Sequence, residues 1–194
     1  MKKTILITIL TTSLLNLYGQ VQTITYVDLD ATGNNDGTSW ADAYTDAQDA
    51  FTNASDNEDI WIAEGTYILQ NTADRNSSFS WTADSVKIYG GFNGTETLLT
   101  QRNTNTNITI LSGDLNNDGI VSNNSYTTLN GPSGSSLNII NYSLIDGLTI
   151  QDGYSNNSSS NAWKWGGGFY LQSYVSKIIF NNCTFKDNYA QGGA

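Results

Sequence analysis

The chain has 194 residues and a formal net charge of −10, from eight basic and 18 acidic residues, and it contains no histidine. Nucleic-acid binding requires clustered Lys and Arg side chains, whereas Arg75 and Arg102 are far apart in sequence and no basic patch surrounds them. We therefore exclude a nucleic-acid-binding protein. Cys183 is the only cysteine, so no internal disulfide can hold the fold. We expect its thiol to be a small buried apolar group rather than a nucleophile.

The first 19 residues have the pattern of a secretory signal peptide. Lys2 and Lys3 precede an apolar run from Ile5 to Leu17, and the small residue Gly19 stands where a signal peptidase would cleave. We expect residues 1–19 to be removed, which leaves six basic residues against 18 acidic ones and a net charge of −12. The apolar run is short for a membrane span, although an anchor is the alternative interpretation. We therefore expect no transmembrane segment and a protein that is secreted or held at the outer cell surface.

Residues 20–58 are expected to form an N-terminal strand and a capping helix. Tyr26–Asp30 read as the strand, and a turn rich in Gly and Asn follows as far as Gly37. After Trp40, small or apolar residues recur at helical spacing on one face, and acidic or polar residues occupy the other. The first set is Ala43, Ala47, Ala50, Phe51 and Ala54, and the second is Asp42, Asp46, Asp49 and Asn53. We interpret the helix as a lid over the first coil, with Trp40 filling the gap beside it. An ordinary amphipathic surface helix is the alternative.

Residues 59–194 are predicted to form short strands that end at glycine or asparagine turns. The strands are Asp59–Ile62, Thr66–Leu69, Val86–Tyr89, Ile108–Leu111, Leu144–Ile150 and Gly166–Leu171. They combine β-branched or aromatic residues with polar ones, as half-buried strands do. In a parallel stack, inward residues of successive turns lie about 4.8 Å apart and form continuous columns. We therefore expect an all-β fold, a right-handed parallel β-helix or solenoid with one N-terminal capping helix.

The last residues, from Asn182 to Ala194, have the pattern of one more turn of this stack, and no further turn follows them. The open end of a stack exposes strand edges and apolar columns that a complete protein covers. We therefore expect the coils of residues 59–194 to be incomplete, and any C-terminal anchoring or sorting domain to lie beyond Ala194.

Several motifs along the chain resemble those of a known superfamily. The motifs are Tyr26–Asp28, Asn35–Trp40, Ala41–Tyr44, Trp61–Tyr67, Ile88–Thr97, Gln101–Arg102 and Ile110–Gly119. They look like the N-terminal start of secreted right-handed parallel β-helix proteins of the pectate-lyase-like superfamily. Cys183–Asn188 with Gly192–Ala194 resembles the repeat of chlamydial polymorphic outer membrane proteins. The resemblance implies a β-helix and a bacterial protein of the secreted or cell-surface class. It implies no single activity, because lyases, hydrolases and adhesins all have this fold.

No catalytic residue can be assigned from the sequence. A polysaccharide lyase of this superfamily would need calcium-binding carboxylates and a basic residue, and a glycoside hydrolase usually needs two carboxylates that face one groove. Asp146, Asp152 and Asp187 are candidates only by residue type, because nothing in the sequence places any two of them on one face. We expect a scaffold, an adhesin or a passenger-type protein that contacts extracellular polysaccharide or a surface protein. The alternative is a polysaccharide lyase or glycoside hydrolase whose active site lies mostly downstream of this segment.

One loop resembles the first half of a calcium-binding loop. Asp114, Asn116 and Asp118 supply oxygen ligands at positions one, three and five, and Gly119 stands at position six. The twelfth position is Ser125 instead of a bidentate acid. The sequence therefore predicts a structural calcium site with a dissociation constant of roughly 10⁻⁴ to 10⁻³ M. The alternative is a turn rich in Asp and Asn between two coils.

Three aromatic residues are candidates for ligand binding. Tyr154, Trp163 and Trp165 flank an insertion rich in Ser and Asn that is expected to bulge from the stack. Exposed aromatic rings in this place would form a stacking platform for sugars. The alternative is that they fold back and seal the loop against a coil, because a large exposed aromatic surface is costly.

Overall fold

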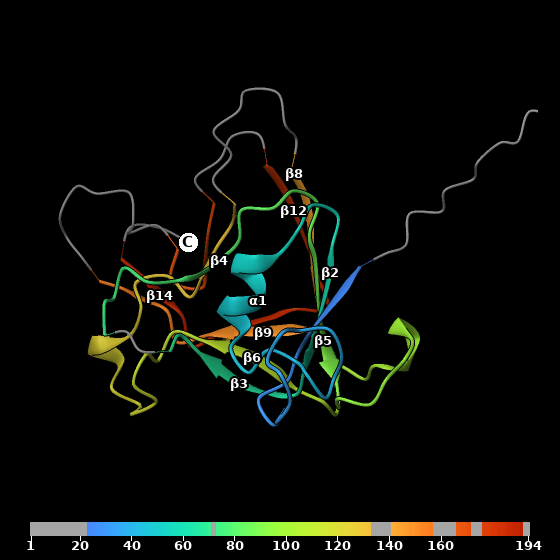
Figure 1. The fold of residues 1–194 in the computed structure, drawn as a ribbon. Helices are drawn as coiled ribbons and strands as arrows, with labels where there is room; N and C mark the ends of the chain where they lie inside the picture. Colours follow the sequence, from blue (N-terminus) through green and yellow to red (C-terminus); the bar gives the residue numbers. More distant parts are fainter. Residues whose placement is uncertain (1–22, 71–72, 133–140, 157–165, 172–175, 192–194) are drawn as a thin grey trace, which may run out of the picture.

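The computed structural model describes residues 23–70, 73–132, 141–156, 166–171 and 176–191 (Figure 1). Trp163 and Trp165 lie outside these ranges. The described residues are mostly in strands, and they include one α-helix, α1 (Ala47–Asn53), and two short 3₁₀ helices at Leu99–Gln101 and Val121–Asn123. No helix in the described ranges combines the length and the apolar character that crossing a bilayer requires.

The largest sheet has five parallel strands. They are β1 (Ile24–Val27), β2 (Asp59–Ala63), β5 (Lys87–Phe92), β8 (Asn141–Asp146) and β12 (Ser176–Asn181), in the order β1-β2-β5-β8-β12. Each of the three inner strands, β2, β5 and β8, therefore lies between the strands of this sheet that come before and after it in the chain.

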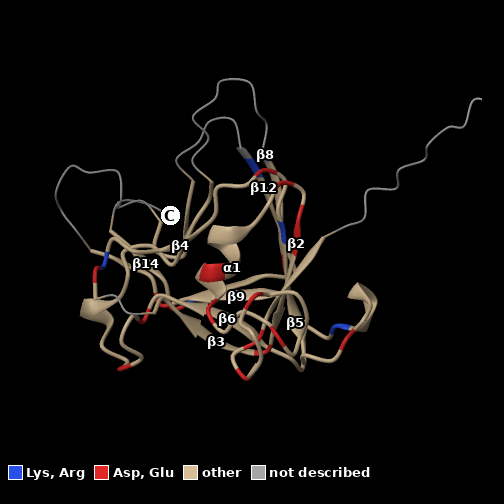
Figure 2. Cartoon of the chain, viewed as in Figure 1, with Lys and Arg blue, Asp and Glu red and all other residues tan. Residues whose placement is uncertain are grey.

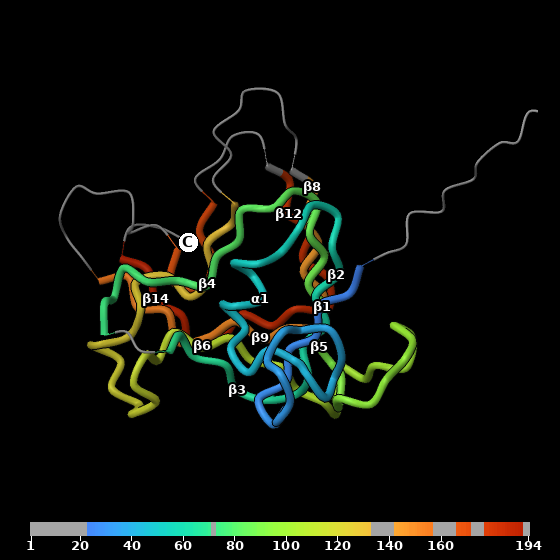
Figure 3. Tube along the Cα trace, viewed as in Figure 1, coloured from blue at the N-terminus to red at the C-terminus, as the bar shows by residue number. Residues whose placement is uncertain are grey.

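Three further sets of strands follow the same rule. The second sheet contains β3 (Gly65–Ile68), β6 (Thr109–Ser112), β9 (Leu148–Gln151) and β13 (Thr184–Lys186), and the third contains β4 (Phe79–Ser80), β7 (Leu129–Asn130) and β11 (Phe169–Tyr170). β10 (Tyr154–Ser155) pairs with β14 (Tyr189–Ala190). All these pairs are parallel. Figure 3 shows β3, β6 and β9 side by side, one from each successive passage of the chain. The expectation of an all-β chain with parallel strands and one helix is confirmed at this level.

Apolar residues line up in columns across the sheets. In the first sheet Ile60, Ile88 and Ile145 are in register, and all three are fully buried. The second sheet aligns Tyr67, Leu111 and Ile150, and the third aligns Phe79, Leu129 and Phe169. These columns belong to one core. Such registers explain why the short strands are stable, since each strand buries its apolar side chains against the strands before and after it.

The helix α1 packs on β4, β1 and β2 (Figure 1). Asp46 is its N-cap, and the Asp46 carboxylate accepts a hydrogen bond from the Gln48 N–H at 2.8 Å. The small residues Ala47 and Ala50 are fully buried, and the Phe51 ring lies 6.1 Å from that of Phe79. The Ala-rich face therefore brings the helix close to the strands, as the sequence pattern indicates.

A second apolar cluster lies on the other face of the first sheet. Tyr26, Trp61 and Tyr89 are in register there, and Trp61 stacks on Phe92 with ring centroids 4.7 Å apart. Trp40 belongs to this cluster, 4.8 Å from the Tyr26 ring, and does not fill the gap beside α1. The expectation for Trp40 was therefore wrong, because its ring packs against the aromatic rings of Tyr26 and Phe92. The Trp40 Nε1–H also donates to the Glu96 carbonyl oxygen at 2.8 Å.

Candidate functional site

The predicted calcium residues lie on one loop that follows β6. The two oxygens of the Asp114 carboxylate accept hydrogen bonds from the backbone N–H groups of Asp118 and Gly119, at 3.2 and 2.9 Å. The Asp118 carboxylate accepts from the Ile120 N–H at 2.8 Å. Asn117 and Gly119 have φ angles of 51° and 70°, which close the turn.

These hydrogen bonds are those of a turn held by its own aspartates. Within the described residues no group of three or more His, Cys, Asp or Glu side chains is arranged to hold a metal ion. Asp114, Asn116 and Asp118 nevertheless share one short exposed loop with oxygen-rich chemistry that fits calcium. The calcium site therefore remains a prediction.

Tyr154 lies in β10, in register with Tyr189 of β14. The Tyr154 ring centroid lies 5.1 Å from that of Tyr189. The guanidinium carbon of Arg75 lies 5.8 Å from the Tyr154 ring centroid. The same guanidinium lies 4.1 Å from the centroid of the Tyr126 ring. Arg75 also donates to the carbonyl oxygen of Tyr154 at 2.7 Å. Tyr154 is therefore partly buried by its neighbours, and its role as a sugar platform remains a prediction.

Two of the three acids that the sequence could not place, Asp146 and Asp152, make hydrogen bonds that hold neighbouring strands and loops together. Asp146 forms an ion pair with Arg102 at 2.8 Å and accepts hydrogen bonds from Asn181 and Asn182, both at 3.0 Å. Asp152 accepts from the Ser112 hydroxyl at 2.7 Å. No hydrogen bond or ion pair brings Asp187 to either of them among the described residues.

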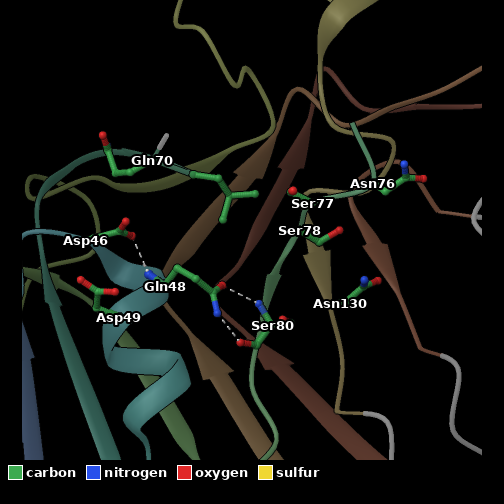
Figure 4. A pocket seen from close by; sticks show the side chains of 10 residues that line it. Asp46, Gln48, Asp49, Gln70, Asn76, Ser77, Ser78, Ser80 and Asn130 are labelled. Atoms are coloured by element: carbon green, nitrogen blue, oxygen red, sulfur yellow. Dashed lines mark hydrogen bonds between the residues drawn. The ribbon is translucent and has the colours of Figure 1, made fainter. Parts of the chain in front are cut away.

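Among the described residues, a polar groove beside α1 is a candidate for a functional site. Its volume is about 650 Å³, within the range of small-ligand sites, roughly 300–1,000 Å³. It is lined by Asp46, Gln48, Asp49, Leu69, Gln70, Asn76, Ser77, Ser78, Ser80 and Asn130. Figure 4 shows the N-terminal end of α1 and Gln70 on one side and the chain around β4 on the other.

Two elements are tied together within this groove. The Gln48 Oε1 accepts from the Ser80 N–H, and the Gln48 Nε2 donates to the Ser80 carbonyl oxygen, both at 2.9 Å (Figure 4). These two hydrogen bonds fix the distance between α1 and β4. The groove is therefore built by well-defined elements on both of these sides, which favours a preformed site.

The groove has an acidic character. Burial raises the pKa of Asp46 above its usual value; the hydrogen bond from the Gln48 N–H opposes this effect and the charge of Asp49 adds to it. No Lys or Arg belongs to the lining residues. Figure 2 shows acidic colour on α1, with the basic residues of the described chain on other elements. The Oδ1 atom of Asn130 is buried and has no hydrogen-bond partner among the described residues.

This groove could not be predicted from the sequence. The helical spacing of Asp46 and Asp49 indicates only the polar face of a helix. Their neighbours across the groove, including Ser78 and Asn130, are far away in sequence and come close only because β4 pairs with β7. The one available signal was Asp46 in front of an Ala-rich helix, which indicates an N-cap and says nothing of a groove.

Comparison of the chain with models of protein families, with curated proteins and with solved structures finds no match.

Proposed function

We propose that the chain forms part of a bacterial, secreted or cell-surface β-helix scaffold of the adhesin or passenger type, which contacts extracellular polysaccharide. The strand order supports the fold, because every described sheet advances in chain order and every pair is parallel. Connections between parallel strands of one sheet are almost always right-handed, so we assign that hand to the coil. The signal-peptide pattern of residues 1–19 supports export.

The groove beside α1 carries the proposal of glycan contact. Its lining supplies hydroxyl, amide and carboxylate groups, and the apolar side chain of Leu69. Sugar hydroxyls both donate and accept hydrogen bonds, so this mixture of groups matches them. A surface of this kind suits contact with a polymer chain better than with an apolar molecule.

The test is retention of the secreted protein on a panel of insoluble polysaccharides, measured with the release of soluble sugar. Ser78→Trp fills the groove with a bulky side chain and is expected to abolish retention. Asn105→Trp places the same ring on an exposed loop and is expected to retain binding. If Ser78→Trp leaves retention unchanged, the groove is not the site of glycan contact. The double variant Trp163→Ala with Trp165→Ala would then test the aromatic residues.

A glycoside hydrolase is the second candidate. The groove brings two carboxylates, Asp46 and Asp49, to one place, and the raised pKa of Asp46 suits a general acid. Release of new reducing ends that disappears in Asp49→Asn would establish this activity. A lyase acting downstream of this segment would instead cleave without dependence on either residue.

A further inference from the structure

The turn that follows β5 carries an exposed asparagine next to a glycine. Asn93 is exposed, and Gly94 has a φ angle of 84°, which glycine adopts without strain. In such a pair the glycine nitrogen can attack the asparagine side-chain amide, because no Cβ hinders the close approach. The chain contains two Asn-Gly pairs, Asn93-Gly94 and Asn130-Gly131.

The two pairs differ in the freedom of the glycine nitrogen. The Gly131 N–H donates to the Tyr170 carbonyl oxygen at 2.9 Å, and Asn130 belongs to β7, which lies between β4 and β11. The Gly94 N–H makes no hydrogen bond within the described ranges. The Gly94 nitrogen is therefore available as a nucleophile, whereas β11 holds that of Gly131.

Thr95 directs two donors at the oxygen on which negative charge would develop. The Asn93 Oδ1 accepts from the Thr95 N–H at 3.1 Å and from the Thr95 hydroxyl at 2.6 Å. Attack on the Asn93 Cγ turns this oxygen into an oxyanion, and donors that already point at it lower the barrier. The Asn130 Oδ1 has no such donor among the described residues.

A buried carboxylate lies beside the same turn. The two oxygens of Glu96 accept from the Asn93 N–H, at 2.8 and 3.1 Å, and one of them also accepts from the Thr95 N–H at 3.1 Å. The Gly94 nitrogen lies between these two N–H groups along the chain. Glu96 is therefore the candidate acceptor for the proton that this nitrogen loses.

We propose that Asn93 is a self-modifying site, promoted by the folded turn, with water as its co-reactant. The Gly94 nitrogen forms a bond with the Asn93 Cγ and gives its proton to Glu96. The bond from Cγ to Nδ2 then breaks, and the leaving nitrogen takes up a proton and departs as ammonia. Water opens the resulting cyclic imide at either of its carbonyl carbons, which gives aspartate or an isoaspartate whose chain runs through Cγ.

The new carboxylate would lie in a place that is already acidic and that anchors an aromatic ring. Glu96 is part of the turn, and Asp28 lies next to it, since a Cβ at Gly94 would be 2.7 Å from the Asp28 Oδ2. The Glu96 carbonyl oxygen accepts from the Trp40 Nε1–H at 2.8 Å. Because like charges repel, the modification should loosen the attachment of Trp40 to this turn.

The test follows both Asn-Gly pairs by peptide mapping and mass spectrometry during incubation at neutral pH, in buffer and in guanidinium chloride. Conversion of amide to acid raises the peptide mass, and chromatography separates aspartate from isoaspartate. We expect Asn93 to convert roughly tenfold faster in the folded protein than in the denatured chain. Asn130 should convert only in denaturant. Conversion of Asn93 in the folded protein at the denatured rate or below overturns the proposal.

Variants test the two groups that are assigned to the turn. Thr95→Val removes the hydroxyl donor and should slow conversion in the folded protein roughly tenfold, and Glu96→Gln should also slow it. Thr97→Val removes an exposed hydroxyl that contacts Gln101 and should leave the rate unchanged. Asn130 reports unfolding, so a variant counts only while Asn130 stays intact in buffer. An unchanged rate in folded Thr95→Val, or an equal loss in Thr97→Val, overturns the role of the turn.

Discussion

The side-chain amide of Gln48 pairs with both backbone polar atoms of Ser80, as a neighbouring strand would. β4 is the edge strand of its sheet, in the order β11-β7-β4. An unpaired edge invites association with other chains. The helix therefore closes this edge through a side chain instead of a strand.

Loss of this pair should destabilise the fold. Gln48→Ala removes the two hydrogen bonds to Ser80 and the exposed one to the Thr52 hydroxyl, and it is expected to lower the free energy of unfolding by about 1–2 kcal/mol. Gln48→Glu should do the same or more, because one carboxylate oxygen would face the Ser80 carbonyl oxygen. Urea denaturation measures both. Gln70→Ala, on an exposed side chain of the same groove, serves as the control and should change the free energy by less than about 0.5 kcal/mol.

Arg102 and Asp146 form a largely buried ion pair. Its disruption should lower the free energy of unfolding by more than loss of the Gln48–Ser80 hydrogen bonds does. Their side chains are 14% and 7% exposed, so Arg102→Met leaves a buried carboxylate without its cation. We expect a loss of about 3 kcal/mol in the free energy of unfolding. The double variant with Asp146→Asn should recover part of this loss. Additive effects of the two single variants in denaturation experiments would contradict the coupling.

Acid should weaken the fold through Asp146. Burial alone would raise the pKa of Asp146, but the hydrogen bonds from Asn182 and Arg102 outweigh it and the pKa lies below its usual value. A lowered pKa in the folded state gives stability that is present above the unfolded value, about 3.9, and lost as the pH falls through the folded value. The free energy of unfolding should therefore decrease below about pH 4. Asp146→Asn should show a shallower decrease, and identical slopes would exclude this residue as the cause.

The thiol of Cys183 should react slowly. Burial raises its pKa, and its Sγ lies 3.4 Å from the Ile145 carbonyl oxygen. Because the thiolate is the reactive form, we expect modification by a disulfide reagent at pH 8 to be at least about tenfold slower in the folded protein than in denaturant. Equal rates in the two conditions would show that the thiol is accessible and ionised.

Calcium should stabilise the fold if the loop at Asp114 binds it. At an ion concentration ten times the dissociation constant, the free energy of unfolding would rise by about 1.4 kcal/mol. Asp118→Asn should remove most of this gain. Asp36→Asn is a matched control, because the Asp36 carboxylate also accepts a backbone hydrogen bond, from the Thr38 N–H at 3.1 Å. Thermal unfolding with and without a chelator decides between an ion site and a turn.

The short parallel strands and the helix could be predicted because their signals are local. Ile60, Ile88 and Ile145 each lie in a β-branched run that ends near glycine, and the Ala-rich face of α1 is visible in seven residues. Trp40 could not be placed, because its partners Tyr26 and Phe92 are brought together only by the fold.

The groove could not be predicted because it depends on very short strands. β4 and β7 have two residues each, too few to show alternation, yet their pairing brings Ser80 and Asn130 side by side. Likewise, the ion pair joins Arg102 to Asp146, which lies 44 positions later in the chain, and no local pattern around either residue indicates the other.

Asp46 both begins α1 and lines the groove, so substitutions at this position are constrained twice. A change to Ser or Thr would keep the cap and lose the charge, and a change to Glu would keep the charge and weaken the cap. Only aspartate meets both demands fully. Asn, Ser or Thr at this position should therefore preserve the helix and at the same time remove one negative charge from the groove.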